Sequence, residues 1–251
     1  MPALTDLMDA AIAYARRGWH VFPCVPRGKV PLIEGGGGFR GATVDESIIR
    51  HWWATQPDAN IGIATGASGL VVLDVDAKND GNTTFDALRL EVGLEFFETA
   101  TAGSPSGGQH VYYSAGGKRV PVGVNVLGPS LDIRAEGGYI VAPPSVGANG
   151  SAYKWFDFLS PDDCDLQTWP DELHRRMATR SEKAASIAED GFVIQGGRND
   201  WLTSRAGAMR NIGLSEAEIR AALREKNLAS CKPPLDQSEV DGIAHSVARY
   251  E

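Results

Sequence analysis

The chain has 251 residues, of which 43% are hydrophobic and 22% charged, a composition typical of a globular protein with one or two domains. Its net charge of −8 provides no global positive field, so any contact with nucleic acid must be local. The three cysteines are scattered and form no CxxC pair, which argues against a zinc site and favours a reducing compartment. No apolar run is long enough to span a membrane, so we expect a cytoplasmic protein. We also expect it to be a monomer.

The first 160 residues alternate predicted helices and strands. Apolar spacing predicts helices over 4–17, 45–54 and 85–92. Short apolar or alternating runs predict strands over 19–22, 61–64, 69–76, 110–113, 131–134, within 137–144 and over 153–158. Pro23 is expected to end the first strand.

The stretch Leu70–Asp76 is the clearest strand and the first candidate site. Four apolar residues run into Asp74 and Asp76, and side chains two residues apart on a strand share a face. Two carboxylates placed in this way repel each other, and a divalent cation that prefers oxygen ligands, Mg²⁺ or Mn²⁺, relieves the repulsion. The alternative is a strand that simply ends in two solvated acids.

Two loops and one further strand carry candidate anion-binding groups. Lys29 lies in a loop bounded by prolines, so it either contacts a phosphate or is a solvated lysine. A small-residue turn, Ser104–Gln109, opens into a strand at His110, and such a turn lets backbone N–H groups approach an anion, although a hairpin turn is the plainer explanation. Asp132 and Arg134 alternate with apolar residues and share one face, as a structural or a functional pair.

The character of the chain changes after about residue 160, where the alternating pattern ends. Residues 171–189 are charged and predict a helical connector. Helices follow over about 199–211, over 215–226 and from 236, and the last two begin with capping-box patterns. We therefore expect two domains, 1–175 and 176–251.

These motifs together resemble the bifunctional primase–polymerase (prim-pol) domain of the archaeo-eukaryotic primase superfamily, in its phage and plasmid form. The likeness covers about residues 8–158 and rests on the segments 19–23, 29–31, 59–66, 70–76, 106–110, 131–134 and 137–144. Residues 191–249 are similar to the small helical domain that often follows prim-pol domains, through 196–199, 213–215, 227, 233–235 and 239–240. The resemblance implies an α+β fold, with a mixed sheet and flanking helices followed by a three-helix domain.

The resemblance also implies a nucleotidyltransferase, a DNA primase and polymerase that synthesises and extends primers on single-stranded DNA from NTPs or dNTPs. Its setting would be phage or plasmid replication, with a replicative helicase fused behind it or bound in trans. Three acids match the family's catalytic positions and would hold two divalent ions, magnesium or manganese, namely Asp74, Asp76 and Asp132. The expected nucleotide-binding residues are Ser106, Gly107, Gly108, His110, Arg134 and Lys29.

The chain departs from the family pattern at one position of the nucleotide site. Many relatives carry a serine two residues before the histidine, whereas this chain has Gly108 there and Ser106 two residues earlier. Backbone N–H groups are then expected to take over the role of that serine.

In the tail we expect DNA contacts from Arg198, Arg205 and Arg210.

Two other functions compete with this interpretation. Phosphohydrolases of the haloacid dehalogenase type also use a strand that ends in DxD, with the first acid as nucleophile. They carry Thr or Val where this chain has Ala77, and the later pair Asp162–Asp163 follows no convincing strand. The second competitor is a non-catalytic replication module that binds DNA or docks a helicase.

Overall fold

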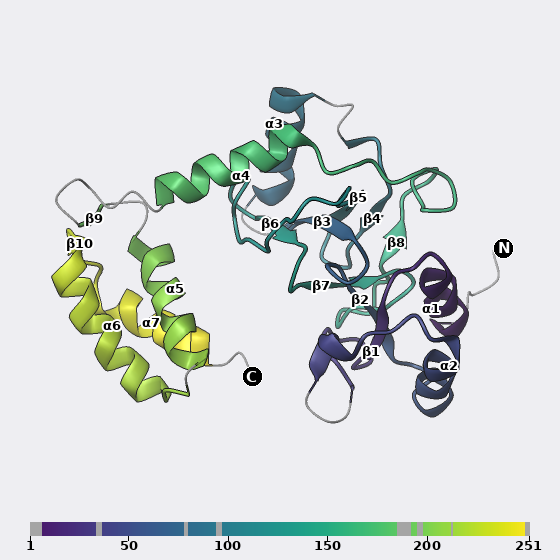
Figure 1. Cartoon of the computed structure of the whole chain (residues 1–251), viewed down its shortest axis with the longest axis horizontal. Helices are drawn as coiled ribbons and strands as arrows, with labels where there is room; N and C mark the ends of the chain where they lie inside the picture. Colours follow the sequence, from purple (N-terminus) through teal and green to yellow (C-terminus); the bar gives the residue numbers. More distant parts are fainter. Residues whose placement is uncertain are drawn as a thin grey trace. The chain divides into compact units, whose positions relative to one another are not determined.

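The computed structural model describes residues 7–33, 37–77, 80–93, 97–184, 192–194, 198–211 and 213–248. The chain divides into two compact units, Met1–Arg176 and Met177–Glu251, here called the N-terminal and the C-terminal unit. Figure 1 labels their helices and strands. None of the described helices is both long and apolar enough to cross a membrane.

The N-terminal unit contains two antiparallel sheets. The smaller sheet has the strand order β1 (Val21–Cys24), β2 (Asn60–Ala64), β7 (Tyr139–Ala142). The larger sheet has the order β6 (Leu131–Arg134), β3 (Leu70–Val75), β5 (Gln109–Ser114), β4 (Thr101–Gly103), β8 (Lys154–Trp155). Parallel pairing among the described residues of this unit occurs only as the isolated bridges Ser114↔Thr168 and Pro121↔Glu136. The predicted α+β class is confirmed, but the strands of both sheets pair antiparallel, whereas the resemblance implied a mixed sheet.

The two sheets share a hydrophobic core. Ile61 and Ile63 of β2 belong to the same buried cluster as Val72 of β3 and Tyr112 of β5. Because side chains alternate along a strand, the face of β3 that carries Val72 also carries Asp74. Asp74 therefore lies on the face of the larger sheet that is buried against the smaller one.

Helices flank both sheets. The helices are α1 (Leu7–Arg16), η1 (a 3₁₀ helix, Gly38–Gly41), α2 (Glu46–Thr55), α3 (Gly81–Val92) and α4 (Asp171–Ala184). Helices α1 and α2 contact each other and pack on β1, whereas α3 packs on β3 and β6 (Figure 1). Asp45 caps α2 by accepting hydrogen bonds from the N–H groups of Ser47 and Ile48, as the predicted start of that helix requires.

The C-terminal unit is built from three helices and a short strand pair. They are β9 (Val193–Ile194), α5 (Arg198–Asn211), α6 (Glu216–Ser230), β10 (Cys231–Lys232) and α7 (Gln237–Ala248). The predicted capping box of α6 is present, since Ser215 and Glu218 bond each other's backbone N–H groups. A core of Leu202, Ile219, Leu223 and Val240 holds the helices together.

Several sequence-based boundaries are wrong for identifiable reasons. Strand β1 continues through Pro23, because β1 is an edge strand, where a missing N–H costs little. Helix α3 begins at Gly81, four residues before the predicted start at 85, and follows Asp80, whose φ of +60° is left-handed. The pair β9–β10 has two residues in each strand, too few to show a period. Residues 4–6 and 185–189 of the predicted helices lie outside the described residues.

Candidate active site

A row of three polar side chains crosses the larger sheet. In the strand register, Asp74 of β3 is paired with His110 of β5 on one side and with Asp132 of β6 on the other. Directly paired residues of antiparallel strands project to the same face. Strand pairing therefore brings together residues that are 36 and 58 positions apart in the sequence.

The row lies at the edge of the core rather than in open solvent. The side chains of Asp74 and Asp132 are 22% and 20% exposed, and that of His110 is 5% exposed. On the opposite face of the same strands, Leu73, Val75 and Ile133 are completely or almost completely buried. The alternation of apolar and acidic residues therefore positions the row, as the sequence predicts.

Arg134 connects the two acids. Its Nη2 donates to Oδ2 of Asp132 over 2.9 Å, and its Nε donates to Oδ2 of Asp74 over 3.3 Å. The predicted shared face of Asp132 and Arg134 is present in the structure. The contact is an ion triad, in which one guanidinium bridges two carboxylates on neighbouring strands.

The other oxygens of the two acids also have partners. Nε2 of His110 lies 3.5 Å from Oδ1 of Asp74, and the backbone N–H of Asn125 donates to Oδ1 of Asp132 over 2.9 Å. Nδ1 of His110 is buried and has no hydrogen-bond partner among the described residues. As placed here, His110 contacts the Asp74 carboxylate, and its predicted contact with a triphosphate remains a prediction.

The environment keeps Asp74 ionised. Burial opposes ionisation, but the hydrogen bond to His110 and the nearby positive charges outweigh it, so the pKa of Asp74 falls to about 2. These charges belong to His110, Arg134 and Lys29. Lys29 is exposed, and its charge is the smallest of the causes that lower the pKa of Asp74.

The pKa of Asp132 is shifted in the opposite direction, above its ordinary value. Burial is the largest cause and raises its pKa, against the hydrogen bond from Asn125 and the charge of Arg134. Repulsion by Asp74 and Asp76 raises it further. Asp76, one residue beyond β3, is therefore electrostatically coupled to Asp132, and the three acids predicted from the sequence form one charge cluster.

The turn before His110 is closed by a serine that the sequence interpretation missed. Oγ of Ser104 accepts a hydrogen bond from the N–H of Gly108 over 3.1 Å and lies 3.1 Å from Oγ of Ser106. Gly107 has a φ of +86°, which favours glycine. Asn82 at the start of α3 donates to the carbonyl of Gly107 over 3.2 Å and ties the turn to that helix.

Gly108 has no room for a side chain. A Cβ atom at this position would lie 2.0 Å from the carbonyl oxygen of Val75 and 3.1 Å from the nitrogen of Ala77. The serine of the family pattern therefore does not fit here, and the hydroxyl groups of Ser104 and Ser106 are the ones available at the turn. Ser104 could have been noticed only as one more small residue beside Pro105.

A buried asparagine positions the Lys29 loop. The side chain of Asn60 donates to the carbonyls of Gly28 and Val146 and accepts from the N–H of Val146. The hydroxyl of Tyr139 also donates to the carbonyl of Lys29 over 3.1 Å. The proline-bounded loop is thus fixed at its backbone, while the Lys29 side chain is exposed.

The three arginines predicted to bind DNA have different surroundings. Arg198 donates to the carbonyls of Pro233 and Pro234, and Arg210 donates to the carbonyl of Ala248 at the end of α7 over 2.5 Å. Both therefore have structural partners inside the C-terminal unit. Arg205 is exposed and lies over the ring of Trp201, 5.1 Å from its centroid, so its charge faces solvent.

The carboxylate groups of the acid row are of the type that divalent cations bind, but in this structure two of them contact Arg134. Carboxylate oxygens are the ligands that Mg²⁺ and Mn²⁺ prefer, and Asp74 and Asp132 are cross-strand neighbours. Within the described part of the chain, however, no three His, Cys, Asp or Glu side chains already form a metal-binding group. The guanidinium of Arg134 bridges the carboxylates of Asp74 and Asp132.

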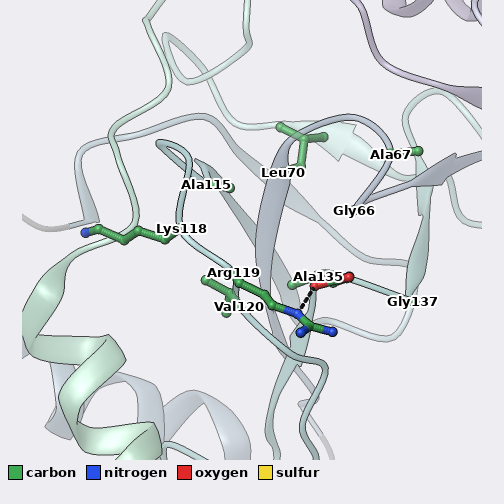
Figure 2. Close-up of a pocket in the computed structure, with 10 residues that line it drawn as sticks. Gly66, Ala67, Leu70, Ala115, Lys118, Arg119, Val120, Ala135 and Gly137 are labelled. Carbon is green, nitrogen blue, oxygen red and sulfur yellow. Dashed lines mark hydrogen bonds and ion pairs between the residues drawn. The ribbon is translucent and has the colours of Figure 1, made fainter.

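A distinct cavity lies at the other end of β3. It has a volume of about 330 Å³ and is lined by Leu70, Lys118, Arg119 and Glu136 among others. Figure 2 shows Arg119 beside the cavity and Lys118 extending away from it. Arg119 pairs with Glu136 over 2.8 Å, and both side chains are more than half exposed. None of the predicted site residues lines this cavity.

Comparison with protein families identifies the family to which the chain belongs. The model of the bifunctional DNA primase/polymerase, N-terminal family matches residues 11–172, which is more than half of the chain, so the chain belongs to this family. Residues 188–251 match the family model Primase C terminal 1 (PriCT-1). No curated protein matches the chain significantly. The resemblance inferred from the sequence is confirmed, and membership implies a DNA template and nucleotide substrates.

Proposed function

We propose that this chain is a DNA primase and polymerase that transfers nucleotides onto primers along single-stranded DNA. The observation that carries the proposal is the acid row, in which Asp74 and Asp132 are held side by side with Asp76 coupled to them. In the reaction, a 3′ oxygen bonds to the α-phosphorus of the incoming nucleotide, the bond to pyrophosphate breaks, and the hydroxyl proton passes to solvent. Two divalent ions held by the three acids would activate the attacking oxygen and stabilise the leaving one.

The remaining residues of the site suit an incoming triphosphate. Arg134 and Lys29 supply positive charge near the acids, and the turn at Ser104–Gly108 supplies the hydroxyl groups of Ser104 and Ser106. Such groups offset the charge that develops on a leaving pyrophosphate. His110 is assigned to the same site through its contact with Asp74.

The C-terminal unit is proposed to hold the template. Residues 177–251 carry 10 Lys and Arg against 11 Asp and Glu, whereas residues 1–176 carry 14 against 21, so the C-terminal unit repels a phosphate backbone less. Arg205 with Trp201 is a cation and an aromatic ring at one exposed position, and this combination is used to bind single strands. Phage or plasmid replication, in the cytoplasm and beside a helicase, is the setting that the family resemblance supports.

Primer synthesis tests the proposal. Purified protein is incubated with single-stranded DNA, Mg²⁺ or Mn²⁺ and labelled dATP or ATP, and the products are separated by length. We expect Asp74→Asn and Asp132→Asn to reduce synthesis on the order of 10³-fold, since a lost metal ligand removes several kcal/mol of transition-state stabilisation. Glu136→Gln is the matched control, because Glu136 is an exposed acid outside the acid row.

The outcomes also separate the competing functions. Wild-type synthesis by Asp74→Asn would contradict the proposal. Binding of single-stranded DNA without any incorporation would indicate a non-catalytic module. Phosphate release together with a covalent phosphoryl group on Asp74 would indicate a phosphohydrolase.

The template contact has its own test within the C-terminal unit. Arg205→Ala is expected to weaken binding to single-stranded DNA and to reduce the salt dependence by about one phosphate contact. Arg224→Ala is the matched control, because Arg224 is paired with Asp241. Equal binding by both variants would remove Arg205 from the interface.

A further inference from the structure

The Arg134 guanidinium lies where the proposed metal ions would have to bind. It contacts the Oδ2 atoms of Asp74 and Asp132, while the Oδ1 atoms face His110 and Asn125. Each of the four carboxylate oxygens therefore already has a donor from the protein. A cation that binds the Oδ2 atoms of both acids competes for them with Arg134.

The two contacts of Arg134 differ in strength. The contact to Asp132, at 2.9 Å, is a normal charge-assisted hydrogen bond, whereas the contact to Asp74, at 3.3 Å, is long. The Arg134 side chain is 35% exposed and extends from β6, which is an edge strand of the larger sheet. A long, partly exposed side chain on an edge strand can change its rotamer without disturbing the core.

We propose that Arg134 is an internal counter-ion that exchanges partners during nucleotide binding. Without nucleotide, its single positive charge offsets part of the negative charge of Asp74 and Asp132. When a nucleotide arrives together with divalent ions, the ions take over the carboxylates and the guanidinium turns to the phosphates. The inference rests on the proposed function and adds a mechanism of coupling, in which metal and nucleotide each favour the binding of the other.

The coupling follows from charge. A metal ion alone must displace Arg134 and leave its guanidinium without an anionic partner, which is costly in a half-buried site. A triphosphate supplies that partner, so the ion binds more tightly in its presence. Because coupling between two ligands is reciprocal, the nucleotide gains the same factor from the metal.

The test measures binding of Mn²⁺ without template DNA, so that no synthesis occurs. Free Mn²⁺ is followed by electron paramagnetic resonance, first with protein alone and then with saturating dATP. For the wild type we expect dATP to tighten Mn²⁺ binding by roughly 5- to 150-fold, the usual range of such coupling. For Arg134→Gln, Mn²⁺ alone is expected to bind about tenfold more tightly than to the wild type, and dATP to add much less.

Two further variants control for charge and fold. Arg134→Lys keeps a positive charge beside the acids, so Mn²⁺ alone is expected to bind it weakly, as it does the wild type. Arg119→Gln removes an arginine paired with an exposed acid elsewhere in the same unit and is expected to leave Mn²⁺ binding unchanged. Thermal melting of all variants shows that each one is folded.

The outcomes separate the exchange from the proposed function. If Mn²⁺ binds Arg134→Gln no more tightly than the wild type, while dATP still promotes binding to both, the exchange is wrong and the proposed function stands. If Mn²⁺ fails to bind the wild type even with dATP, the metal-dependent function is wrong, and the exchange is wrong with it.

Discussion

The two ends of strand β3 show which feature marks a site in this fold. At one end, Asp74 shares a half-buried triad with Asp132 and Arg134. At the other end, about 13 Å away by the rise of a strand, Leu70 borders a cavity of about 330 Å³. The ion pair of Arg119 and Glu136 at this cavity is exposed.

The difference is one of electrostatic coupling rather than of space. At the acid end, burial and neighbouring charges shift the pKa of two carboxyl groups in opposite directions. At the cavity end, the exposed pair has water as an alternative partner and contributes little. Carboxyl groups with shifted pKa values are typical of functional sites. If the acid end is the site, substitutions there should change stability and primer synthesis more than substitutions at the cavity end.

The largest expected effect comes from restoring the family's serine. Gly108→Ser would place Cβ 2.0 Å from the carbonyl oxygen of Val75, so β3 and the turn would have to separate beside the acid row. Overpacking of this kind costs about 3 kcal/mol or more when backbone must move. We expect a lower midpoint of urea unfolding and loss of primer synthesis, although the change makes the sequence look more like that of its relatives.

A matched glycine separates the clash from a general effect of added side chains. Gly37 precedes η1 with a φ of −75°, and a Cβ there would meet only one atom within 4 Å. Gly37→Ala is expected to change stability by less than about 1 kcal/mol. If Gly108→Ser is as stable and active as Gly37→Ala, the close approach of turn and strand is wrong.

The second prediction concerns pH. The pKa of Asp74 in the folded protein, about 2, lies below its ordinary value of 3.8, so the ionised form stabilises the fold above about pH 4. Linkage gives about 2 kcal/mol at neutral pH, of which about half is lost by pH 3. The difference in unfolding free energy between wild type and Asp74→Asn should therefore shrink as pH falls from 5 to 3.

Glu136→Gln supplies the comparison at the other end of β3. Its partner Arg119 is 86% exposed, and a screened pair of this kind contributes little. Its difference from the wild type should stay small and flat over the same pH range. A flat difference for Asp74→Asn as well would show that the acid row is not coupled in the folded protein.

Much of the fold could be predicted because the periodic spacing of apolar residues and the capping of helices depend on residues that are close together in the sequence. The alternation that places Asp132 and Arg134 on one face, and the capping box at Ser215, are set by residues two or three positions apart. Strand register is different, because the pairing of Asp74 with both His110 and Asp132 depends on contacts far apart in the sequence. The family resemblance, not the pattern alone, brought these residues together in advance.

The sequence identified charged residues of the proposed sites but not the hydrogen bonds that they form. The sequence shows that Arg198 and Arg210 are basic, yet not that carbonyl groups of the same unit bind them. In the same way, it shows small residues before His110, but not that Ser104 closes the turn. Hydrogen bonds between a side chain and the backbone depend on the conformation of the loops. Loop conformation produces no regular spacing of residue types, so it cannot be recognised from the sequence pattern.

The third prediction separates two serines at the turn. Ser104→Ala removes the acceptor of the Gly108 N–H and should cost about 1 kcal/mol of stability while raising KM for dATP several-fold. Ser106→Ala removes an exposed hydroxyl and should raise KM without changing stability. Ser151→Ala, at another exposed turn of the unit, is the control. An unchanged KM in both variants would leave the triphosphate to backbone donors and charged residues.

The smallest effect is expected at the cavity. Arg119→Gln breaks only an exposed pair, so we expect a change of less than about 0.5 kcal/mol in unfolding free energy and primer synthesis within twofold of the wild type. Lys118→Ala should be slightly more harmful, because Lys118 donates to the carbonyl of Trp169 over 2.6 Å and pairs with Asp171 at the start of α4. Both rates are measured beside Asp74→Asn under the same conditions. A large loss of synthesis in Arg119→Gln with unchanged stability would place function at the cavity and reverse the contrast between the two ends of β3.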